Sequence, residues 1–413
     1  MSEVTSNFPQ LRFPDFDDKW EEKRLSDIAE KSNVKNRDNE VSSVFTNSAT
    51  KGVVNQRDFF DKDIVNQNNL DGYYIINHDN FVYNPRISFS APVGPLNRNH
   101  LGTGVMSPLY TILKINNVSL DFIERYFKTT KWHRYMNNIA NIGARHDRMN
   151  IISSDFMKMP IPLPKDEEQQ KIAASLAAVD NKIEQLSKKQ ELLGEYKKGL
   201  MQQIFSQEIR FKADDGSDFP DWEDGLLNTL IDNSRKIRYG IVQPGKYDKN
   251  GKYLIRGKDY SNGWEIPSEF FKVSDAIEKK YSKTRVKKGD VIVCIVGSVG
   301  NVMVIPGWLD GANITQTTAR IAPDKNKLNN QYLYFYFQSL VGRNMIHKHT
   351  RVGTRPGLNI EDVEKFSILL PSLLEQAKIA NFLSSIDNKI EQVGKQLDES
   401  KQFKKALLQQ MFV

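Results

Sequence analysis

The sequence predicts an α+β protein in which two globular mixed α/β domains are separated by two long helices that pair as an antiparallel intramolecular coiled coil. Two observations predict this fold. The hexapeptide DNKIEQ occurs at residues 180–185 and again at 387–392, and its surroundings repeat with the same offset of 207 residues (387 − 180). Both copies carry apolar residues at the alternating spacing of a coiled-coil seam. The chain is therefore an internal duplication, a pseudo-two-fold repeat of domain and helix.

Each repeated helix has a clear start and a narrow apolar face. The segments EQQKIAASLAAVDNKIEQ and EQAKIANFLSSIDNKIEQ both follow a proline and begin with acidic residues, which the positive end of the helix dipole favours. The 37 residues from 168 to 204 would extend roughly 55 Å as a helix. The predicted seam consists of Ile172, Leu176, Val179, Ile183 and Leu186 in the first helix, and of Ile379, Leu383, Ile386, Ile390 and Val393 in the second.

A seam this narrow and long has to be buried against another helix, and its own copy is the obvious partner. A two-fold axis across the pair makes the helices antiparallel and puts the domain before each helix at opposite ends. A parallel pair would crowd both domains at one end. The alternative is that the two segments are independent surface helices.

The two halves share an outline outside the helices. Trp20 matches Trp222, DFIERYF at 121–127 matches QYLYFYF at 331–337, and GARHDRMNI at 143–151 matches GTRPGLNI at 353–360. Between these landmarks the halves share little and contain short strands and turns. The predicted boundaries are a first domain at residues 1–160, a helix at 161–206, a second domain at 207–367 and a helix at 368–413.

Length and composition indicate a folded protein of more than one domain. The chain has 413 residues, of which 39% are hydrophobic and 26% are charged. It has no apolar run of about 18 residues and no basic, apolar start, so neither a membrane span nor a secretory signal is predicted. The single cysteine, Cys294, excludes an internal disulfide and a thiolate metal cluster. We therefore expect a cytoplasmic protein.

Motifs for catalysis are missing from the sequence. It has no glycine-rich phosphate loop and no Asn-Pro-Pro-Tyr motif of an amino-methyltransferase. The six histidines lack the paired spacing of metal ligands. The sequence therefore predicts no catalytic residue, no metal site and no enzyme activity for this chain alone.

Basic residues gather at matching places in the two halves, where each cluster runs into the Gly-x-Arg segment. The net charge of +7 permits an anionic partner such as nucleic acid, whose phosphates arginine and lysine neutralise. The first cluster contains Lys131, Arg134, Arg145, His146 and Arg148, and the second contains Arg343, His347, Lys348, Arg351 and Arg355. Further candidates at strand ends and turns are Asn84, Arg86 and Arg98 in the first domain and Arg256, Lys258 and Ser298 in the second.

Several segments of the repeated helices and of the domains resemble those of the DNA-specificity subunits of type I restriction–modification systems. PIPLPKDEEQQKIA and SILLPSLLEQAKIA are similar to the entries into that family's two constant helices, and KKALLQQMF is similar to their end. KKGDVIVCIVGSVGNV and RFPDFDDKWEEKRLSDI resemble stretches of its target recognition domains. The first domain departs from the pattern, because SAPVGPLN stands where the second domain has IVGSVGN.

The resemblance implies a function and a set of partners. Each target recognition domain would read one half of a bipartite double-stranded DNA target, and the coiled coil would set the spacer and dock two adenine-N6 methyltransferase subunits. Restriction subunits with motor activity would join them. The chain itself would hold no cofactor, since S-adenosylmethionine, ATP and magnesium belong to the partner subunits.

Two rival interpretations stay open at this stage. The chain could be a helical scaffold or adaptor that never reads DNA, or a self-contained enzyme with an unrecognised site. The pseudo-two-fold arrangement also predicts that Met1 and Val413 lie near each other. The polar faces of the helices, including the lysine doublets at 197–198 and 404–405, are candidate docking surfaces.

Overall fold

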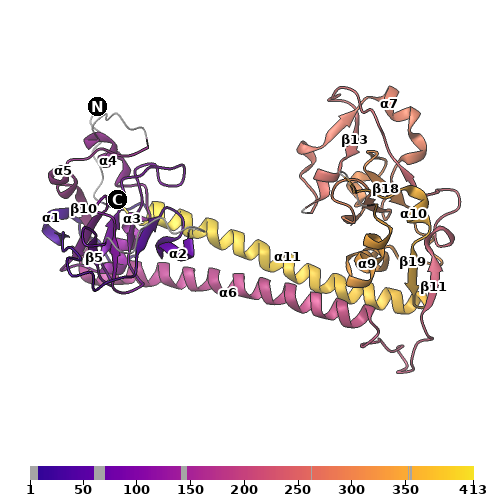
Figure 1. Ribbon diagram of the computed structural model, residues 1–413, viewed down its shortest axis with the longest axis horizontal. Helices are drawn as coiled ribbons and strands as arrows, with labels where there is room; N and C mark the ends of the chain where they lie inside the picture. The colour runs from indigo at the N-terminus through magenta and orange to yellow at the C-terminus, as the bar shows by residue number, and fades with distance from the viewer. Residues whose placement is uncertain (1–7, 60–69, 141–146, 262, 352, 354–355) are drawn as a thin grey trace. The chain divides into compact units, whose positions relative to one another are not determined.

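The computed structural model describes residues 8–59, 70–140, 147–261, 263–351, 353 and 356–413, which form two compact units (Figure 1). Unit 1 consists of Met1–Ser187 and Lys395–Val413, and unit 2 consists of Lys188–Gly394. The long helices α6 (Asp166–Phe205) and α11 (Leu373–Gln410) are each divided between the units, so each unit holds one domain and a part of both helices. None of the helices in the described part has a stretch long and apolar enough to cross a membrane.

Unit 1 is built on a four-stranded antiparallel sheet. Before α6 its elements are β1 (Glu21–Arg24), α1 (Leu25–Ile28), β2 (Ala29–Ser32), β3 (Phe45–Ser48), β4 (Gly52–Asn55), α2 (Gln56–Phe59), β5 (Tyr74–Ile76), β6 (Phe81–Tyr83), β7 (Leu96–Arg98), β8 (Gly104–Met106), β9 (Thr111–Ile115), α3 (Leu120–Phe127), α4 (His133–Ile139), α5 (Ser153–Met157) and β10 (Pro160–Leu163). The main sheet has the order β2–β9–β6–β7, and the two-stranded pairs are β1–β10, β3–β4 and β5–β8.

Unit 2 has its own four-stranded antiparallel sheet. Between α6 and α11 its elements are β11 (Glu223–Leu226), β12 (Arg238–Tyr239), β13 (Lys252–Ile255), β14 (Phe271–Val273), α7 (Asp275–Lys280), β15 (Val291–Cys294), β16 (Val302–Val304), β17 (Asn313–Ile314), β18 (Thr318–Ile321), α8 (Asn330–Gln338), α9 (Leu340–His349), α10 (Ile360–Glu364) and β19 (Ser367–Leu370), with five short 3₁₀ turns. The main sheet has the order β12–β18–β15–β16, beside the smaller sheet β14–β13–β17 and the pair β11–β19.

The two main sheets have the same topology. β2, β6, β7 and β9 of unit 1 occupy the places of β12, β15, β16 and β18 of unit 2, and every neighbouring pair is antiparallel. The short pair β1–β10 likewise corresponds to β11–β19, because each joins the start of a domain to the strand that leads into a long helix. The predicted internal repeat is therefore present in the fold, although the sequences of the two domains share little.

In unit 1 an aromatic cluster holds the end of α11 against the domain. Phe412 is 1% exposed and lies 6.4 Å from Trp20, 5.2 Å from Phe122 and 6.2 Å from Tyr126, measured between ring centroids. Ring pairs at these separations contribute about 0.5–1.5 kcal/mol each beyond the burial of their area. The same core contains Ile172 from the start of α6.

Unit 2 repeats this cluster with residues from the other copy. Phe205, at the end of α6, is 1% exposed and lies 6.5 Å from Trp222 and 5.7 Å from both Tyr332 and Tyr336. Ile379 from the start of α11 belongs to the same core. Each domain thus binds the beginning of one long helix and the end of the other, which forces the two helices to run antiparallel.

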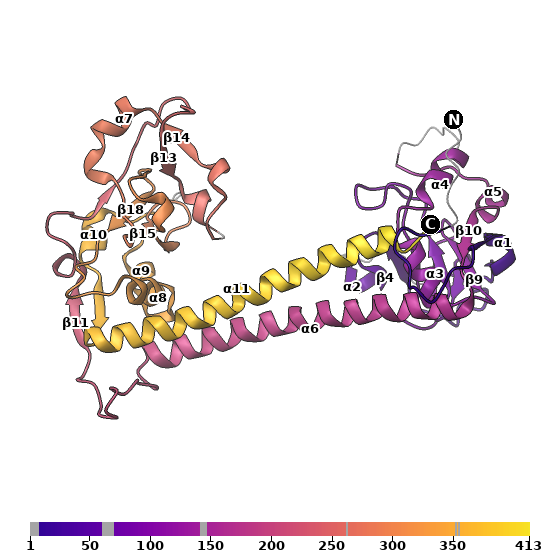
Figure 2. The same ribbon diagram turned by 180° about the vertical axis from the view of Figure 1, so that it is seen from behind.

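The predicted antiparallel pairing of the two helices is confirmed. In each unit the parts of α6 and α11 that belong to it lie side by side (Figures 1 and 2). Lys404 pairs with Asp180 at 2.5 Å in unit 1, and Lys197 pairs with Asp387 at 2.6 Å in unit 2. These ion pairs are copies of each other under the repeat. They place one lysine of each doublet at the helix contact rather than on a free face.

Burial of the predicted seam is uneven along the two helices. Ile172, Leu176, Ile379, Leu383, Ile386 and Val393 are buried, whereas Val179, Ile183, Leu186 and Ile390 are half-buried. Two helices alone cannot surround a seam residue completely. Residues at the start of each helix are the most deeply buried, since a domain covers them there, but Val393 in the middle of α11 is buried as well.

The glutamate of each repeated Glu-Gln pair anchors the chain that enters the domain. Glu168 accepts hydrogen bonds from Arg12 at 2.7 and 2.8 Å, and Glu375 accepts them from Arg210 at 3.2 and 2.8 Å. Trp222 Nε1 also donates to Glu375 at 3.0 Å. Since Glu168 is 1% and Glu375 is 0% exposed, both ion pairs are largely withdrawn from water.

The glutamine of each pair joins the long helix to a helix of the domain. Gln169 Oε1 accepts from the backbone N–H of Ser119, the N-cap of α3, at 3.0 Å. Gln376 Oε1 accepts from Asn329, the N-cap of α8, at 2.8 Å. Both amides also donate to a preceding proline carbonyl at 2.9 Å. The Glu-Gln pair is therefore repeated because its glutamate and its glutamine make equivalent contacts in both units.

The beginning of the described chain lies beside the end of α11. Leu11 N donates to Gln410 O at 2.9 Å, as Ile209 N donates to Gln203 O at 3.1 Å after α6. The predicted neighbourhood of Met1 and Val413 involves a residue outside the described part. The hydrogen bond of Leu11 to Gln410 nevertheless shows that the two stretches of sequence that form unit 1 contact each other near their ends.

Replacing Glu375 with Gln should lower the free energy of unfolding by about 3 kcal/mol, because the buried carboxylate is the partner of the Arg210 guanidinium and of the Trp222 indole. Urea denaturation followed by tryptophan fluorescence measures the change. Glu391→Gln, at an exposed position of the same helix, is the matched control and should change stability by less than about 0.5 kcal/mol. Equal stability of the two variants would refute the role given to Glu375.

Candidate nucleic-acid interface

In unit 1 the connection from β6 to β7 meets the segment that follows α4. Ile87 N donates to Asp147 O at 3.0 Å, Met149 N donates to Pro85 O at 2.8 Å, and Arg86 and Arg148 face each other across this antiparallel bridge. Beside it is a hollow of about 440 Å³. Its polar lining includes Asn47, Ser48, Gln56, Asn84, Arg86, Ser88, Tyr110 and Arg148. Side chains more than 60 residues apart in the sequence are thus brought to one rim.

In unit 2 the connection from β15 to β16 meets the segment that follows α9. Leu358 N donates to Ile295 O at 2.8 Å, and Val296 pairs with Gly357. A hollow of about 1000 Å³ opens here. Its polar lining includes Tyr260, Ser261, Ser298, Asn301, Tyr334, Gln338, Arg343, His347 and Thr350.

The two hollows share one wall in the repeat, but α8 and α9 also line the unit 2 hollow, whereas no described residue of α3 or α4 lines the unit 1 hollow. Each hollow is bordered by the connection β6–β7 or β15–β16, between two neighbouring strands at one edge of the main sheet. The basic segment that pairs with this connection also borders the hollow. Their linings differ, because unit 1 presents two arginines, Arg86 and Arg148, with one tyrosine, whereas unit 2 presents one arginine and one histidine, Arg343 and His347, with two tyrosines. One backbone arrangement therefore presents two different chemical surfaces.

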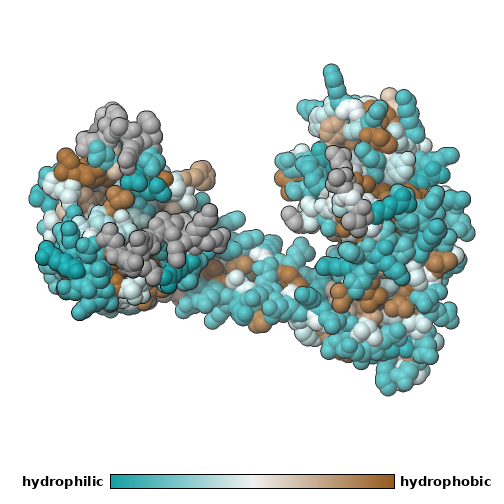
Figure 3. Space-filling view, in the orientation of Figure 1, coloured by the Kyte–Doolittle hydropathy of each residue, from teal (hydrophilic) through white to brown (hydrophobic). Residues whose placement is uncertain are grey.

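Exposed cations border both hollows. Arg86 is 63% and Arg148 is 25% exposed, and both lie within 3.7 Å of Asp147. Arg343, His347 and Lys348 are exposed on α9, and within the described part of the chain no ion pair involves them. On the face shown in Figure 3, small groups of hydrophobic residues are scattered among hydrophilic ones in both units. A ligand at either hollow would meet polar and cationic groups.

Comparison with known families identifies the chain. The model of the type I restriction modification DNA specificity domain matches residues 17–193 and 231–400, once in each half. The chain belongs to this family. The two matches agree with the repeat of sheet, hollow and long helix described above.

Individual relatives of this specificity chain support the same assignment. It is 25% identical over 297 residues to the type I restriction enzyme EcoBI specificity subunit of Escherichia coli, covering 67% of this chain and 62% of that protein. It is 29% identical over 325 residues to the MjaVIII specificity subunit of Methanocaldococcus jannaschii, covering 74% and 72%. The solved S subunit of a type I restriction–modification system from M. genitalium has the same fold, with a TM-score of 0.55, 15% identity and coverage of 98% and 99%.

Several predicted site residues of the specificity chain lie away from the hollows. Arg256 is held by Asp259 at 2.9 Å, and Lys258 lies 3.8 Å from the same carboxylate. Arg351 lies 3.7 Å from Asp362. Lys131 and Arg134 flank the start of α4 and do not line the hollow of unit 1. Arg145, His146 and Arg355 lie outside the described residues.

Arg98 has a different environment from the one its position suggested. Its side chain is 11% exposed and donates to Asp79 at 2.6 and 2.7 Å, with Asp121 at 2.5 Å and Glu124 at 3.7 Å. Burial alone would lower the pKa of Arg98, but the hydrogen bonds to Asp79 and Asp121 outweigh it and raise the pKa. The guanidinium is thus occupied by carboxylates and does not face the hollow.

Other polar residues of the hollows were not predicted. Asn47 Nδ2 donates to Val82 O at 2.7 Å and to Pro95 O at 3.1 Å, which fixes the floor of the unit 1 hollow. In unit 2 the buried hydroxyls of Tyr260 and Thr318 lie 2.9 Å apart, and burial raises the pKa of Tyr260, so this phenol stays protonated. Asn47 and Tyr260 carry no charge, so a search of the sequence for basic clusters does not reveal them.

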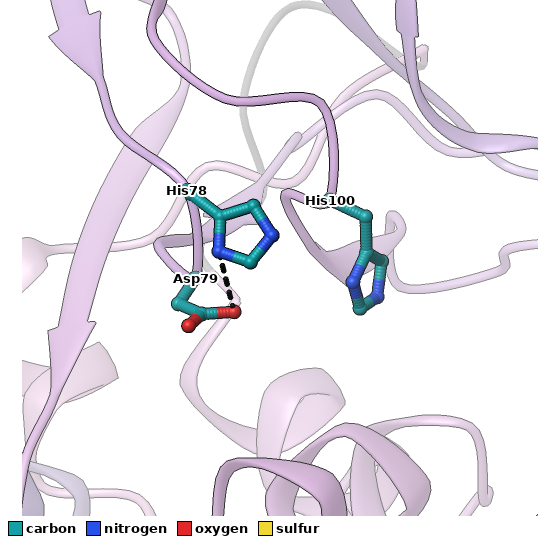
Figure 4. A group of neighbouring side chains, drawn as sticks. All are labelled: His78, Asp79 and His100. Carbon is teal, nitrogen blue, oxygen red and sulfur yellow. Dashed lines mark ion pairs between the residues drawn. The ribbon is translucent and has the colours of Figure 1, made fainter.

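The structure brings together a group that sequence spacing did not indicate. Ligand atoms of His78, Asp79 and His100, one from each, lie within 4.8 Å of one another (Figure 4). The carboxylate of this group is already bound by Arg98, whose fixed positive charge opposes a second cation. His100 faces Glu124 at 3.2 Å. The group therefore belongs to the ionic network around Arg98.

Replacing Arg98 with Met should lower the free energy of unfolding at pH 7 by about 2 kcal/mol, because the charge-assisted hydrogen bonds to Asp79 and Asp121 are lost. Arg98 holds the pKa of Asp79 below its usual value against the opposing effect of burial. A depressed pKa stabilises the fold above the unfolded value of about 3.9, and this contribution is lost as the pH falls through the lower folded value.

The stability difference between wild type and Arg98→Met should therefore narrow as the pH falls from 5 to 3. Thermal unfolding at each pH measures it, with the exposed Arg37→Met as the control. A gap that is independent of pH would contradict the assignment of Asp79 as the partner.

Proposed function

We propose that this chain is the DNA-specificity subunit of a type I restriction–modification complex, in which each domain reads one half of a bipartite double-stranded target. One observation carries the proposal. The same strand connection, on two copies of one sheet, borders a cation-lined hollow in each unit, while the residues that line the two hollows differ. A split target with two unlike halves needs this combination of one scaffold and two surfaces.

The groups at each rim suit the two parts of DNA recognition. Exposed arginine and lysine neutralise phosphates and fix the position of the domain on the duplex, which makes binding depend on salt. Amides pair with adenine and arginine pairs with guanine at the major-groove edge, each discriminating by about 1–3 kcal/mol. In unit 1, Asn84, Arg86 and Arg148 provide these groups, and in unit 2 Ser298, Arg343 and His347 provide them, with the exposed Lys348 next to His347 on α9.

We propose that the paired helices set the spacer and bind the partner subunits. A helix of 40 residues, such as α6, extends roughly 60 Å, which exceeds one turn of B-DNA at about 34–36 Å. Lys198 and Lys405 stay exposed, whereas Lys197 and Lys404 form the ion pairs between the helices. Two equivalent exposed positions suit two copies of one partner, an adenine-N6 methyltransferase.

Catalysis in this proposal belongs to the partners, which act together with this chain in the cytoplasm. The methyltransferase subunits would bind S-adenosylmethionine, and separate restriction subunits with motor activity would bind ATP and magnesium. The role of this chain is to choose the site at which they react.

Addition of methyltransferase subunits and S-adenosylmethionine to the purified chain should give adenine methylation at one bipartite sequence. Sequencing that detects methylated adenine maps the motif, and the chain alone should methylate nothing. Methylation by the chain alone would favour a self-contained enzyme. In a second experiment, residues 1–160 are exchanged for another recognition domain. If the methylated sites then stay the same, the chain is a scaffold that does not read DNA.

Arg148→Ala and Arg343→Ala should each weaken binding to that duplex by between about 5-fold and 150-fold, because each removes a cation at the rim of one hollow. Arg148→Ala should relax selectivity in one half of the motif and Arg343→Ala in the other. Fluorescence anisotropy with duplexes altered in one half measures both effects. Lys182→Ala, an exposed lysine on α6, is the control. If either variant lost selectivity in both halves of the motif, the assignment of one half to each domain would be contradicted.

A further inference from the structure

Phe89 is the most exposed large apolar side chain in the described part of the chain. Its relative exposure is 106%, and the serines on both sides of it, Ser88 and Ser90, are exposed as well. A phenylalanine buries about 150–250 Å² when it packs, so full exposure forgoes a large contact area. It lies at the tip of the β6–β7 connection, directly after Ser88, which lines the unit 1 hollow.

A tight turn holds Phe89 in this position. Ser88 and Ala91 exchange two backbone hydrogen bonds, at 3.0 and 3.1 Å, and Ser88 Oγ accepts a further one from Ala91 N at 3.2 Å. Ala91 is 8% exposed, so the second arm of the turn is anchored in the domain. Phe89 is therefore presented by a short rigid hairpin.

The two arms of the β6–β7 connection are also held together at its base. Gly94 has a φ of +81°, and a Cβ at this position would lie 2.2 Å from Asn84 O, so only glycine lets the two arms approach each other. Tyr83 Oη donates to Val93 O at 2.9 Å, and Ile87 N is tied to Asp147 O. The ring is thus held with little freedom apart from its own rotation.

The charges beside this ring favour a polyanion. Arg86 and Arg148 lie on the two strands of the bridge that leads to the hairpin, and Asp147 at 3.6–3.7 Å offsets one of their two charges. Proteins that insert an apolar wedge between base pairs also need cations nearby to hold the phosphates, and these two arginines are close to Phe89 in the chain or on the paired strand.

We propose that Phe89 inserts between two neighbouring base pairs of the half-site read by the first domain and kinks the duplex there. This inference rests on the proposed function, because it needs a DNA target at the unit 1 hollow. Unstacking one step costs a few kcal/mol and is offset by aromatic stacking and by the phosphate contacts that the bend allows.

The second domain has no such wedge. Its matching connection carries Gly297, Ser298, Val299 and Gly300, and it is shorter than the one in unit 1. Val299 is half-buried, and the exposed residues Val296, Gly297 and Ser298 carry no aromatic ring. The inserted step is therefore confined to one half of the target, where flexible pyrimidine–purine steps deform most easily.

The test uses the full chain without partner subunits, so that no base flipped by a methyltransferase contributes. The probes are duplexes that carry the motif found by methylation mapping, each with 2-aminopurine at one adenine position of the first half-site. Wild type should raise the fluorescence at one step only, because 2-aminopurine brightens when it loses stacking. Phe89→Ala should abolish this signal and weaken binding between about 5-fold and 100-fold.

Phe403→Ala is the matched control, because Phe403 lies in unit 1 on α11 and is 57% exposed. It should leave both the signal and the affinity unchanged, and equal melting temperatures of both variants would exclude misfolding. If wild type and Phe403→Ala bind the duplex but Phe89→Ala matches them, the wedge is refuted while the proposed function stands.

Two other outcomes have separate meanings. Lower affinity of Phe89→Ala without any fluorescence increase in wild type would place the ring on the groove surface and refute insertion. Absence of salt-dependent binding by wild type would refute the proposed function itself.

Discussion

Phe205 and Phe412 are the contacts on which the rest of the structure depends. Each lies at the end of a long helix and completes the aromatic core of a domain whose other side holds the start of the other helix. With a domain bound to one beginning and one end, α6 and α11 have to run antiparallel. The ion pairs of Lys404 with Asp180 and of Lys197 with Asp387 then fix the register within each unit.

This arrangement explains which parts of the chain repeat closely and which do not. The Glu-Gln pair, the seam and the last turn of each helix contact the same partners twice, so their sequences are constrained twice. The connections β6–β7 and β15–β16 each border the hollow of their own unit and pair with a segment of the same domain. They are free to differ in length and chemistry, as the proposed reading of two unlike half-sites requires.

The sequence was sufficient for the helices because their signals are local. Apolar spacing, proline before the helix and the exact repeat of DNKIEQ predict α6 and α11 without knowledge of any distant contact. The common strand order of the two sheets was not predicted, because register depends on pairs such as Phe81 with Leu113 that are far apart in the chain. The same limit applies to the site. Arg148 was predicted from a basic cluster and Arg86 from its place at a strand end, but only the fold shows that they share a rim. Only the fold shows that Arg98 is engaged by Asp79, Asp121 and Glu124.

The division of unit 1 into two separate stretches of sequence has a consequence for biosynthesis. Its core needs Leu407, Met411 and Phe412, which the ribosome adds roughly 10 to 50 s after the first domain has emerged. During this interval Trp20 and Phe122 lack the ring that covers them. Unit 2 is continuous and has Phe205 in place before its domain is made. The core of unit 2 also needs Ile379 and Leu383 from α11, but these residues precede Leu407, so the core of unit 1 is the later of the two to be completed.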